Sequence, residues 1–344
     1  MGYRPLLVDL DIENNMIVPP GCIGSTSPKV QIPCDDLSED SVCFYYGYRA
    51  ANMDAKLYKK QVTELSEIVG TKINNKVEEL KKEYADLIQN RDEKSKLSSL
   101  KAMVDPFSTS KIPIELASGS IINAMLIPNE PSERTIKFLA THFNAQYVIV
   151  VESERLFIKL NEQYKDDRKT KLRKMPRSPG VATIDDMNKI IAKNLSYKTY
   201  FNGVLNNLDT FEVGLDLKEY KLFTPEFVKI PRSALQYGAK EDLQKIYIKR
   251  VDPTTIPLQN RVVGVLDPVN VEILEKYEKE IEEGVNHNKE DFYQLINTSL
   301  CRSLIHVNYY DQDKDQLIVN ATSPDGLKSK YLIVGDLTYE KDTL

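Results

Sequence analysis

The chain has 344 residues and a formal net charge of −5, because 51 Asp and Glu residues nearly balance 46 Lys and Arg residues. A chain of this length is expected to form about two domains, and its charge balance excludes a globally basic nucleic-acid binder, although not a local basic patch. The four cysteines show no C-x-x-C spacing and only three histidines accompany them, so no metal site is predicted. We expect reduced thiols, as in the cytoplasm or nucleus, and no membrane span.

The first predicted element is a buried parallel strand over residues 4–11, an apolar run that ends in a carboxylate. Strands of this kind deliver side chains to the carboxyl edge of an α/β sheet, where ligands bind. Asp11 is therefore a candidate to bind a water of Mg²⁺ or to accept a proton from an attacking hydroxyl. The alternative is that Asp11 caps the turn that follows. The sequence favours neither interpretation over the other.

A second strand is predicted over residues 42–48, and a helix with one buried face over residues 53–70, from the spacing of Leu57, Val62, Leu65 and Val69. A charged insertion over residues 71–103 follows, and its apolar residues form a seam of about two heptads, fewer than a coiled coil requires. The segment is either a solvated helical excursion packed on its own domain or a partner-binding helix. The apolar positions of the seam are Ile73, Val77, Leu80, Tyr84 and Leu87.

Strand, helix and strand then succeed one another over residues 119–127, 135–145 and 147–152, which predicts a βαβ unit in a parallel sheet. A helix over residues 155–164 comes next. Residues 165–177 carry seven basic residues against two acids. This segment is interpreted either as a loop that contacts phosphate or RNA, or as a solvated helix end and linker.

Residues 183–200 are predicted to be helical, with an apolar stripe formed by Ile184, Met187, Ile190, Ile191 and Leu195. Beyond Gly203 the pattern changes to short β-like runs separated by prolines and turns, which predicts a separate, mainly antiparallel domain. A charged helix over residues 270–283 interrupts it. The predicted strands are residues 211–215, 220–223, 245–251, 261–266, 303–310, 316–321 and 331–336.

Phosphoryl transfer on a parallel sheet usually relies on a G-x-x-x-x-G-K-[ST] loop, whose amides, lysine and hydroxyl hold the phosphates and Mg²⁺. This motif is absent from the sequence. No set of Ser, His and Asp or of Cys and His residues forms a local nucleophilic site either.

The order of short motifs along the chain nevertheless resembles a known family. The motifs are Leu10-Asp11, Pro20-Gly21, Tyr46-Gly47, Lys56-Leu57-Tyr58, Ser118-Gly119-Ser120-Ile121-Ile122-Asn123, Glu154-Arg155-Leu156-Phe157, Ser178-Pro179-Gly180-Val181, Tyr200-Phe201-Asn202-Gly203, Leu235-Gln236-Tyr237-Gly238, Ser323-Pro324 and Tyr331-Leu332-Ile333-Val334-Gly335-Asp336. In order and spacing they resemble the Clp family, the polynucleotide-kinase-like subunit of pre-mRNA cleavage factor IA. The sequence looks like an N-terminally truncated, divergent fungal-type member.

The resemblance implies an α/β fold in which an incomplete P-loop NTPase-like parallel sheet with helices precedes a smaller, mainly antiparallel β domain. The implied domains are residues 1–205, a partial kinase-like domain that lacks its first strand and P-loop, and residues 206–344. The family's tryptophan near Ile127 is absent. Where active members have lid arginines, this chain has Lys193, Ser196 and Lys198.

These departures favour a non-catalytic nuclear subunit of the pre-mRNA 3′-end cleavage and polyadenylation machinery, which bridges other processing factors. Its implied partners are cleavage factor IA subunits, including the scaffold subunit that binds the RNA polymerase II tail, with indirect RNA contact and no membrane. The alternative is an ATP-dependent RNA 5′-hydroxyl kinase with Asp11 as base and Lys193 and Lys198 as lid cations. No cofactor is expected in this chain, but ATP and Mg²⁺ are expected if a P-loop is encoded upstream. A third hypothesis is a partner-binding module built on residues 71–103.

Overall fold

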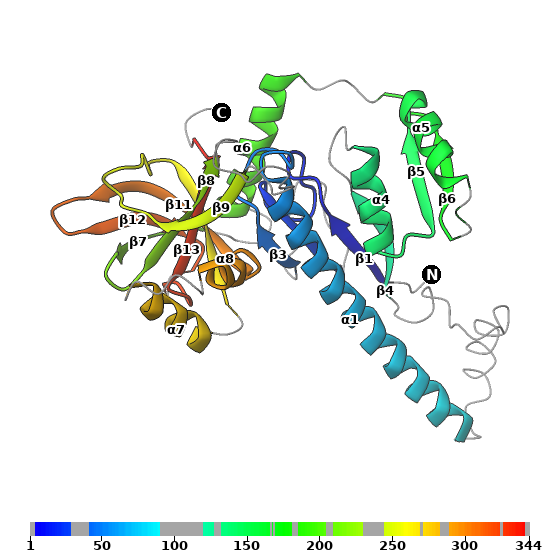
Figure 1. The fold of residues 1–344 in the computed structure, drawn as a ribbon, viewed down its shortest axis with the longest axis horizontal. Coiled ribbons are helices and arrows are strands. Elements are labelled where there is room, and N and C mark those ends of the chain that lie inside the picture. Colours follow the sequence, from blue (N-terminus) through cyan, green and yellow to red (C-terminus); the bar gives the residue numbers. More distant parts are fainter. Residues whose placement is uncertain are drawn as a thin grey trace, which may run out of the picture.

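The computed structural model describes residues 4–28, 41–89, 120–126, 132–165, 167, 169–180, 185–203, 209–229, 244–268, 271–282, 289–323 and 326–340. Helices and strands alternate in the N-terminal half, and a large sheet dominates the C-terminal half (Figure 1). Within these ranges no helix has both the length and the apolar character needed to cross a membrane.

The first sheet has four strands in the order β3-β2-β1-β4. β1 and β4 are parallel, whereas β2 and β3 join as antiparallel strands. The prediction that the strands over residues 119–127 and 147–152 share one parallel sheet is wrong for the described structure, because the second of them lies in a separate sheet. The observed β1 ends two residues before the predicted end at Asp11. The strands are β1 Arg4–Asp9, β2 Cys22–Thr26, β3 Ser41–Tyr45 and β4 Ser120–Leu126.

Helix α1, Ala55–Gln89, covers the first sheet with the predicted apolar face, since Leu57, Val62, Leu65 and Val69 are buried in the same cluster as β1. The helix does not stop at Gly70, because a single glycine inside a helix costs only about 1 kcal/mol. It continues into the predicted insertion and projects from the rest of the fold (Figure 1). Ile73 still packs on the core. The side chains of the remaining seam positions and residues 90–103 lie outside the described residues, so the seam stays a prediction.

A second, two-stranded parallel sheet pairs β5, Tyr147–Val151, with β6, Lys171–Met175. Helices α4, Glu133–His142, and α5, Glu154–Tyr164, pack on its buried face. The interpretation of residues 165–177 as a loop or helix end is therefore wrong for residues 171–175. Only Leu172 of β6 packs inward while its charged neighbours are exposed, so the strand lacks the apolar run that would have identified it.

Helix α6, Asp186–Asn202, buries a different face from the one predicted. Met187, Ile190, Ile191 and Leu195 are each between 41% and 67% exposed, and Ile184 lies outside the described residues. The buried side chains are Asn194, Tyr197 and Phe201, because only the C-terminal half of α6 packs against the large sheet. The N-terminal half projects from the described fold (Figure 1).

The large sheet has seven strands in the order β7-β12-β11-β10-β13-β8-β9, and all its pairs are antiparallel except β13 with β8. These pairings confirm the prediction that the C-terminal part is mainly antiparallel. Its sheet is larger, not smaller, than the two sheets that contain the parallel pairs β1–β4 and β5–β6. The strands are β7 Phe211–Asp216, β8 Lys221–Lys229, β9 Gln244–Arg250, β10 Arg261–Asp267, β11 Leu300–Asp311, β12 Gln316–Ala321 and β13 Tyr331–Thr338.

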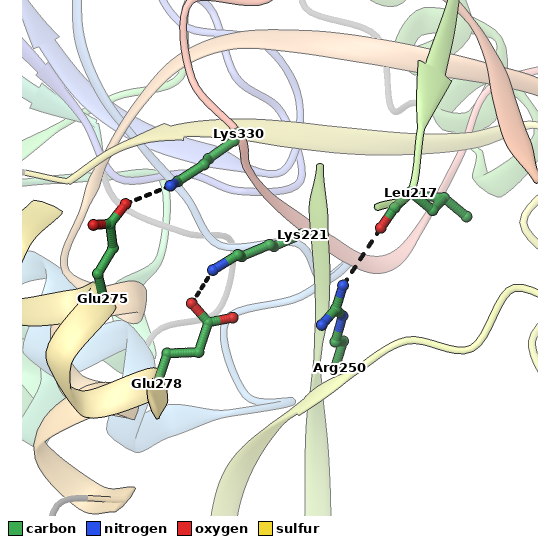
Figure 2. Close-up of polar contacts among 6 residues, drawn as sticks. All are labelled: Leu217, Lys221, Arg250, Glu275, Glu278 and Lys330. Atoms are coloured by element: carbon green, nitrogen blue, oxygen red, sulfur yellow. Dashed lines mark hydrogen bonds and ion pairs between the residues drawn. The ribbon is translucent and has the colours of Figure 1, made fainter. Parts of the chain in front are cut away.

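Two helices lie beside the large sheet, of which α7, Val271–Glu282, was predicted and α8, Lys289–Asn297, was not. α7 is held by two ion pairs, Glu275 with Lys330 and Glu278 with Lys221 (Figure 2). Both lysine Nζ atoms also lie 5.7 Å from the centroid of the Tyr331 ring.

The first sheet and the large sheet share one hydrophobic core. It contains Cys22, Cys43 and Tyr45 from the first sheet, Tyr197 and Phe201 from α6, and Phe223, Val262, Cys301 and Ile333 from the large sheet. These three cysteines are free and buried, and Cys34 lies outside the described residues. The predicted domain boundary falls within residues 204–208, which the structure does not describe.

A backbone contact between Gly47 and Gly335 joins the segment after β3 to β13. The N–H of Asp336 donates to the Gly47 carbonyl at 2.9 Å, and a Cβ on Gly335 would lie 1.9 Å from that carbonyl oxygen. Gly47 has φ +80°, a conformation that glycine adopts without strain. The Tyr45 hydroxyl bridges the same place, because it donates to the Val262 carbonyl at 2.7 Å and accepts from the Gly335 N–H at 3.3 Å.

Gly335→Ala should destabilise the chain by about 3 kcal/mol or more, because the clash is with backbone that cannot rotate away. Urea unfolding measures the loss. The matched control is Gly70→Ala on α1, where an added Cβ meets nothing within 4 Å. That control should stabilise the chain by roughly 0.5–1 kcal/mol through helix propensity. Equal effects of the two substitutions would refute the close contact.

Candidate functional site

The loop after β1 is organised by Asp9, a fully buried carboxylate that the sequence analysis did not single out. Its Oδ2 accepts hydrogen bonds from the N–H groups of Met16 at 2.7 Å and Ile17 at 3.1 Å, and its Oδ1 accepts from Asp11 N–H at 3.1 Å. Burial raises the pKa of Asp9, and the three N–H bonds oppose that rise. Asp9 thus folds residues 10–17 back onto the end of the strand.

Asp11, the predicted catalytic candidate, makes local contacts in this loop. Its Oδ1 accepts from the backbone N–H groups of Glu13 at 3.1 Å and Asn14 at 3.2 Å, and its Oδ2 accepts from Asn14 Nδ2 at 3.4 Å. These are the contacts of a turn-capping aspartate. The neighbouring Tyr58 hydroxyl donates to the Leu10 carbonyl at 3.0 Å, which fixes α1 against the loop.

Lys193 lies in a group of charges that we call the junction cluster, formed by Glu13, Arg49, Lys193 and Asp336. Burial, followed by the nearby Arg49 guanidinium, lowers the pKa of Lys193 to about 8, while Asp336 and Glu13 act in the opposite direction. Its ammonium lies 5.9 Å from the centroid of the Tyr197 ring. Arg49 Nη2 donates to Thr338 Oγ1 at 3.4 Å, and Asp336 Oδ1 is buried without a hydrogen-bond donor in the described structure.

Lys198, the second predicted lid cation, is exposed on α6 and is not part of this cluster. Positions five residues apart on a helix point about 140° from each other, so the two lysines diverge. The structure therefore brings Lys193 and the loop that contains Asp11 into one region and leaves Lys198 outside it.

Backbone packing places the junction cluster. The carbonyl of Gly21 accepts the N–H groups of Tyr46 at 3.0 Å and Gly47 at 3.1 Å, and the Tyr197 hydroxyl donates to the Pro20 carbonyl at 2.9 Å. Gly335 closes this arrangement from the large sheet. The motifs Pro20-Gly21, Tyr46-Gly47 and Gly335-Asp336, which carried the resemblance, thus meet at one point where small residues are required for packing.

The chemistry available to the junction cluster is ionic. Two cations and two carboxylates balance one another, and a lysine with a lowered pKa can bind anions or exchange a proton near neutral pH. Among the described residues, no group of three or more His, Cys, Asp or Glu residues could hold a metal ion.

Comparison with known proteins gives a consistent result. The sequence matches the family described as mRNA cleavage and polyadenylation factor CLP1 P-loop over residues 1–84 and 90–203. The "Protein CLP1 homolog" of Arabidopsis thaliana is 24% identical over 348 residues, which cover 98% of this chain and 64% of that protein. The mRNA cleavage and polyadenylation factor CLP1 of Debaryomyces hansenii is 23% identical over 232 residues, or 59% of this chain and 42% of that protein.

The fold is also similar to solved structures. A Clp1p structure that addresses its extended interface with Pcf11p has a TM-score of 0.65 at 16% identity and covers 98% of this chain and 68% of its own. The wild-type Clp1p–Pcf11p complex has a TM-score of 0.64 at 15% identity. These likenesses show an α/β fold of the P-loop type with an added antiparallel sheet. The chain spans 64% of the length of the Arabidopsis relative.

Asp9→Ala should destabilise the chain by about 3 kcal/mol, because three backbone N–H donors lose their acceptor and all three hydrogen bonds are buried or partly buried. Asp11→Ala is the matched control, since it removes a turn cap that is half exposed and should cost about 1 kcal/mol or less. Urea unfolding of both variants gives the difference. If Asp11→Ala proved the more destabilising of the two, the role assigned to Asp9 would be wrong.

Lys193→Met should raise stability at pH 7, because it removes a charge whose burial is unfavourable. The folded pKa is about 8 and the unfolded pKa keeps its usual value of 10.5, so above pH 8 the unfolded chain binds more protons. The contribution of Lys193 to the stability of the wild type therefore increases between pH 8 and pH 10.5. The Lys193→Met variant lacks this pH-dependent increase. Unfolding free energies at pH 7 and pH 9 test the difference, with Lys198→Met as an exposed control on the same helix that should leave both values unchanged.

Proposed function

Because this chain belongs to the CLP1 family of mRNA cleavage and polyadenylation factors, we propose that it is a non-catalytic subunit of the pre-mRNA 3′-end processing machinery. The observation that carries the proposal is the family match over residues 1–84 and 90–203, which includes the Pro20-Gly21 and Tyr46-Gly47 motifs of the junction. The proposed role is to bridge other processing factors in the nucleus.

The proposed principal partner is the counterpart of Pcf11p, the protein that accompanies Clp1p in the similar solved structures. The likeness to those structures extends over 98% of this chain. A subunit that bridges factors needs a rigid body with accessible surfaces, and the core shared by the two sheets supplies that rigidity. We include in this proposal the scaffold subunit that binds the RNA polymerase II tail.

Three features support a non-catalytic role. The carboxylate oxygens of Asp11 are engaged by the turn that it caps, and Lys198 points away from the region of Asp11 and Lys193. The sequence contains no G-x-x-x-x-G-K-[ST] loop. Electrostatic stabilisation by such a loop and its metal is usually the largest catalytic contribution in phosphoryl transfer, and one aspartate does not replace it.

The competing function is an ATP-dependent RNA 5′-hydroxyl kinase with Asp11 as base. What favours it is position, because Asp11 lies just beyond the carboxyl end of a strand in a parallel pair, where the ligands of α/β sheets bind. The two functions differ in whether this chain binds ATP and whether Asp11 is needed.

The test uses the full purified chain in two measurements. In the first, the tagged chain is mixed with the Pcf11p counterpart of the same organism, and co-elution from a sizing column is expected. In the second, calorimetry with ATP and Mg²⁺ should show no binding at micromolar ATP concentrations. Asp11→Asn should leave co-elution unchanged.

Micromolar ATP affinity, or transfer of phosphate to a 5′-hydroxyl RNA that is lost in Asp11→Asn, would overturn the non-catalytic proposal in favour of the kinase. Failure to co-elute with the Pcf11p counterpart would overturn the bridging role.

A further inference from the structure

Three free thiols meet in the core that the first sheet and the large sheet share. Cys22 lies on β2, Cys43 on β3 and Cys301 near the start of β11, and all three belong to one cluster of buried side chains. Cys22 is fully buried, while Cys43 and Cys301 are 8% and 9% exposed. These nucleophiles take no part in the junction cluster or in the loop after β1, so their proximity needs an account of its own.

The pairing of β2 with β3 places two of the thiols on one face of the first sheet. In this antiparallel pair Cys22 lies opposite Tyr45, and Cys43 lies opposite Gly24. Because residues two apart on a strand point to the same face, Cys22 and Cys43 are diagonal neighbours on it. This face is directed at the large sheet, since the Tyr45 hydroxyl on it donates to the Val262 carbonyl.

Cys301 approaches this face from the large sheet. β11 packs against β3, and Cys301 is paired with Leu266 of β10 at a point where the register of the two strands shifts. Each two of the three thiols are hydrogen-bonded neighbours, so Cys301 contacts both Cys22 and Cys43. A cluster of three sulfur atoms is therefore assembled from two different sheets.

The three thiols differ in acidity. The Cys22 and Cys43 thiols, which bond to the Cys301 sulfur, hold the pKa of Cys301 well below its usual value. The Cys301 sulfur in turn raises the pKa of Cys22, and for the pKa of Cys43 the lowering effect of Cys22 is outweighed by Cys301 and burial. The cluster thus favours one thiolate beside two protonated thiols, which is the arrangement of a nucleophile with its resolving partners.

We propose that Cys301 is a site of peroxide oxidation, at which a disulfide forms with Cys22 or Cys43 and covalently joins the large sheet to the first sheet. The Cys301 thiolate attacks one oxygen of hydrogen peroxide and becomes a sulfenic acid, while the other oxygen leaves as hydroxide and takes up a proton to give water. The neighbouring thiol then attacks the sulfenic sulfur, which forms the S–S bond and releases a second water. The two cysteines lose two electrons in all, and the peroxide gains them. The proposal does not depend on the proposed function.

Burial limits which oxidants can act and which product results. Side chains that are less than a tenth exposed admit a small reagent such as hydrogen peroxide and exclude bulky ones such as oxidised glutathione. The resolving thiol is already in contact with Cys301, so the sulfenic acid is converted to a disulfide before a second peroxide reaches it. The expected product is a reversible bridge rather than a sulfinic or sulfonic acid.

The experiment uses the full chain carrying Cys34→Ala, so that only the three cysteines of the cluster remain. The folded chain is treated with hydrogen peroxide, free thiols are blocked after denaturation, and the digest is mapped by mass spectrometry without reduction. Two of the three thiols should be lost, Cys301 should be linked to Cys22 or Cys43, and dithiothreitol should restore both thiols. Oxidation in urea is the control, because an unfolded chain closes the short loop between Cys22 and Cys43 more readily than a long loop to Cys301.

Variants in the same background separate the nucleophile from the resolving thiols. Cys301→Ala should slow the loss of thiols about tenfold or more, because the remaining two thiols are both protonated. Of Cys22→Ala and Cys43→Ala, the variant that keeps the partner found by mapping should still form the disulfide. Thermal unfolding of each variant shows whether it folds, and the mapping of the parent chain decides the pairing without any change in the cluster.

The proposal is overturned if the folded parent chain keeps its three thiols in peroxide, or if Cys22 is linked to Cys43 instead. It is also overturned if a folded Cys301→Ala variant loses thiols as fast as the parent, or if Cys301 is recovered only as a sulfinic or sulfonic acid, because no resolving thiol would then have reached it.

Discussion

The contact between Gly47 and Gly335 is the constraint on which the rest of the fold depends. A Cβ on Gly335 would lie 1.9 Å from the Gly47 carbonyl oxygen, and a Cβ on Gly47 would lie 2.7 Å from the Tyr45 ring, so neither residue can carry a side chain without displacing a neighbour. Tyr45 then lies across the large sheet, where a Cβ on Gly264 would be 2.7 Å from its ring. Because the hydrophobic core continues through this point, the parallel and antiparallel parts are expected to unfold together rather than as independent domains.

The same constraint explains why several motifs carry the resemblance without carrying catalysis. Pro20-Gly21, Tyr46-Gly47 and Gly335-Asp336 are small or aromatic residues that allow three segments to meet through backbone hydrogen bonds. Their charged neighbours Glu13, Arg49 and Lys193 are gathered there by this packing. A motif whose residues are required for packing predicts the fold well. It does not show whether a nearby site still performs chemistry.

The sequence predicted the elements with uninterrupted patterns and missed those whose pattern depends on distant neighbours. β1, β4 and the apolar face of α1 were predicted because their apolar residues follow the strand or helix period. β6 was missed because its side chains are mostly charged. The predicted buried face of α6 was wrong because Tyr197 and Phe201 pack into the core, whereas the aliphatic stripe stays exposed. Sequence alone could not decide between Asp9 and Asp11, since only the return of Met16 and Ile17 shows which carboxylate is buried. The environment of Lys193 depends on Arg49 and Asp336, both more than a hundred residues away in sequence.

The tyrosines buried at the junction give the chain an internal spectroscopic reporter. The sequence has 19 tyrosines and no tryptophan, so its near-ultraviolet signal above 270 nm arises almost entirely from phenol rings. Burial holds the pKa values of Tyr45 and Tyr197 well above the usual value, which keeps their phenols un-ionised while the junction is closed. Separation of the two sheets would return both rings to water and to ordinary acidity. The tyrosinate absorbance at alkaline pH therefore follows the exposure of the buried tyrosines, Tyr45 and Tyr197 among them, without any added label.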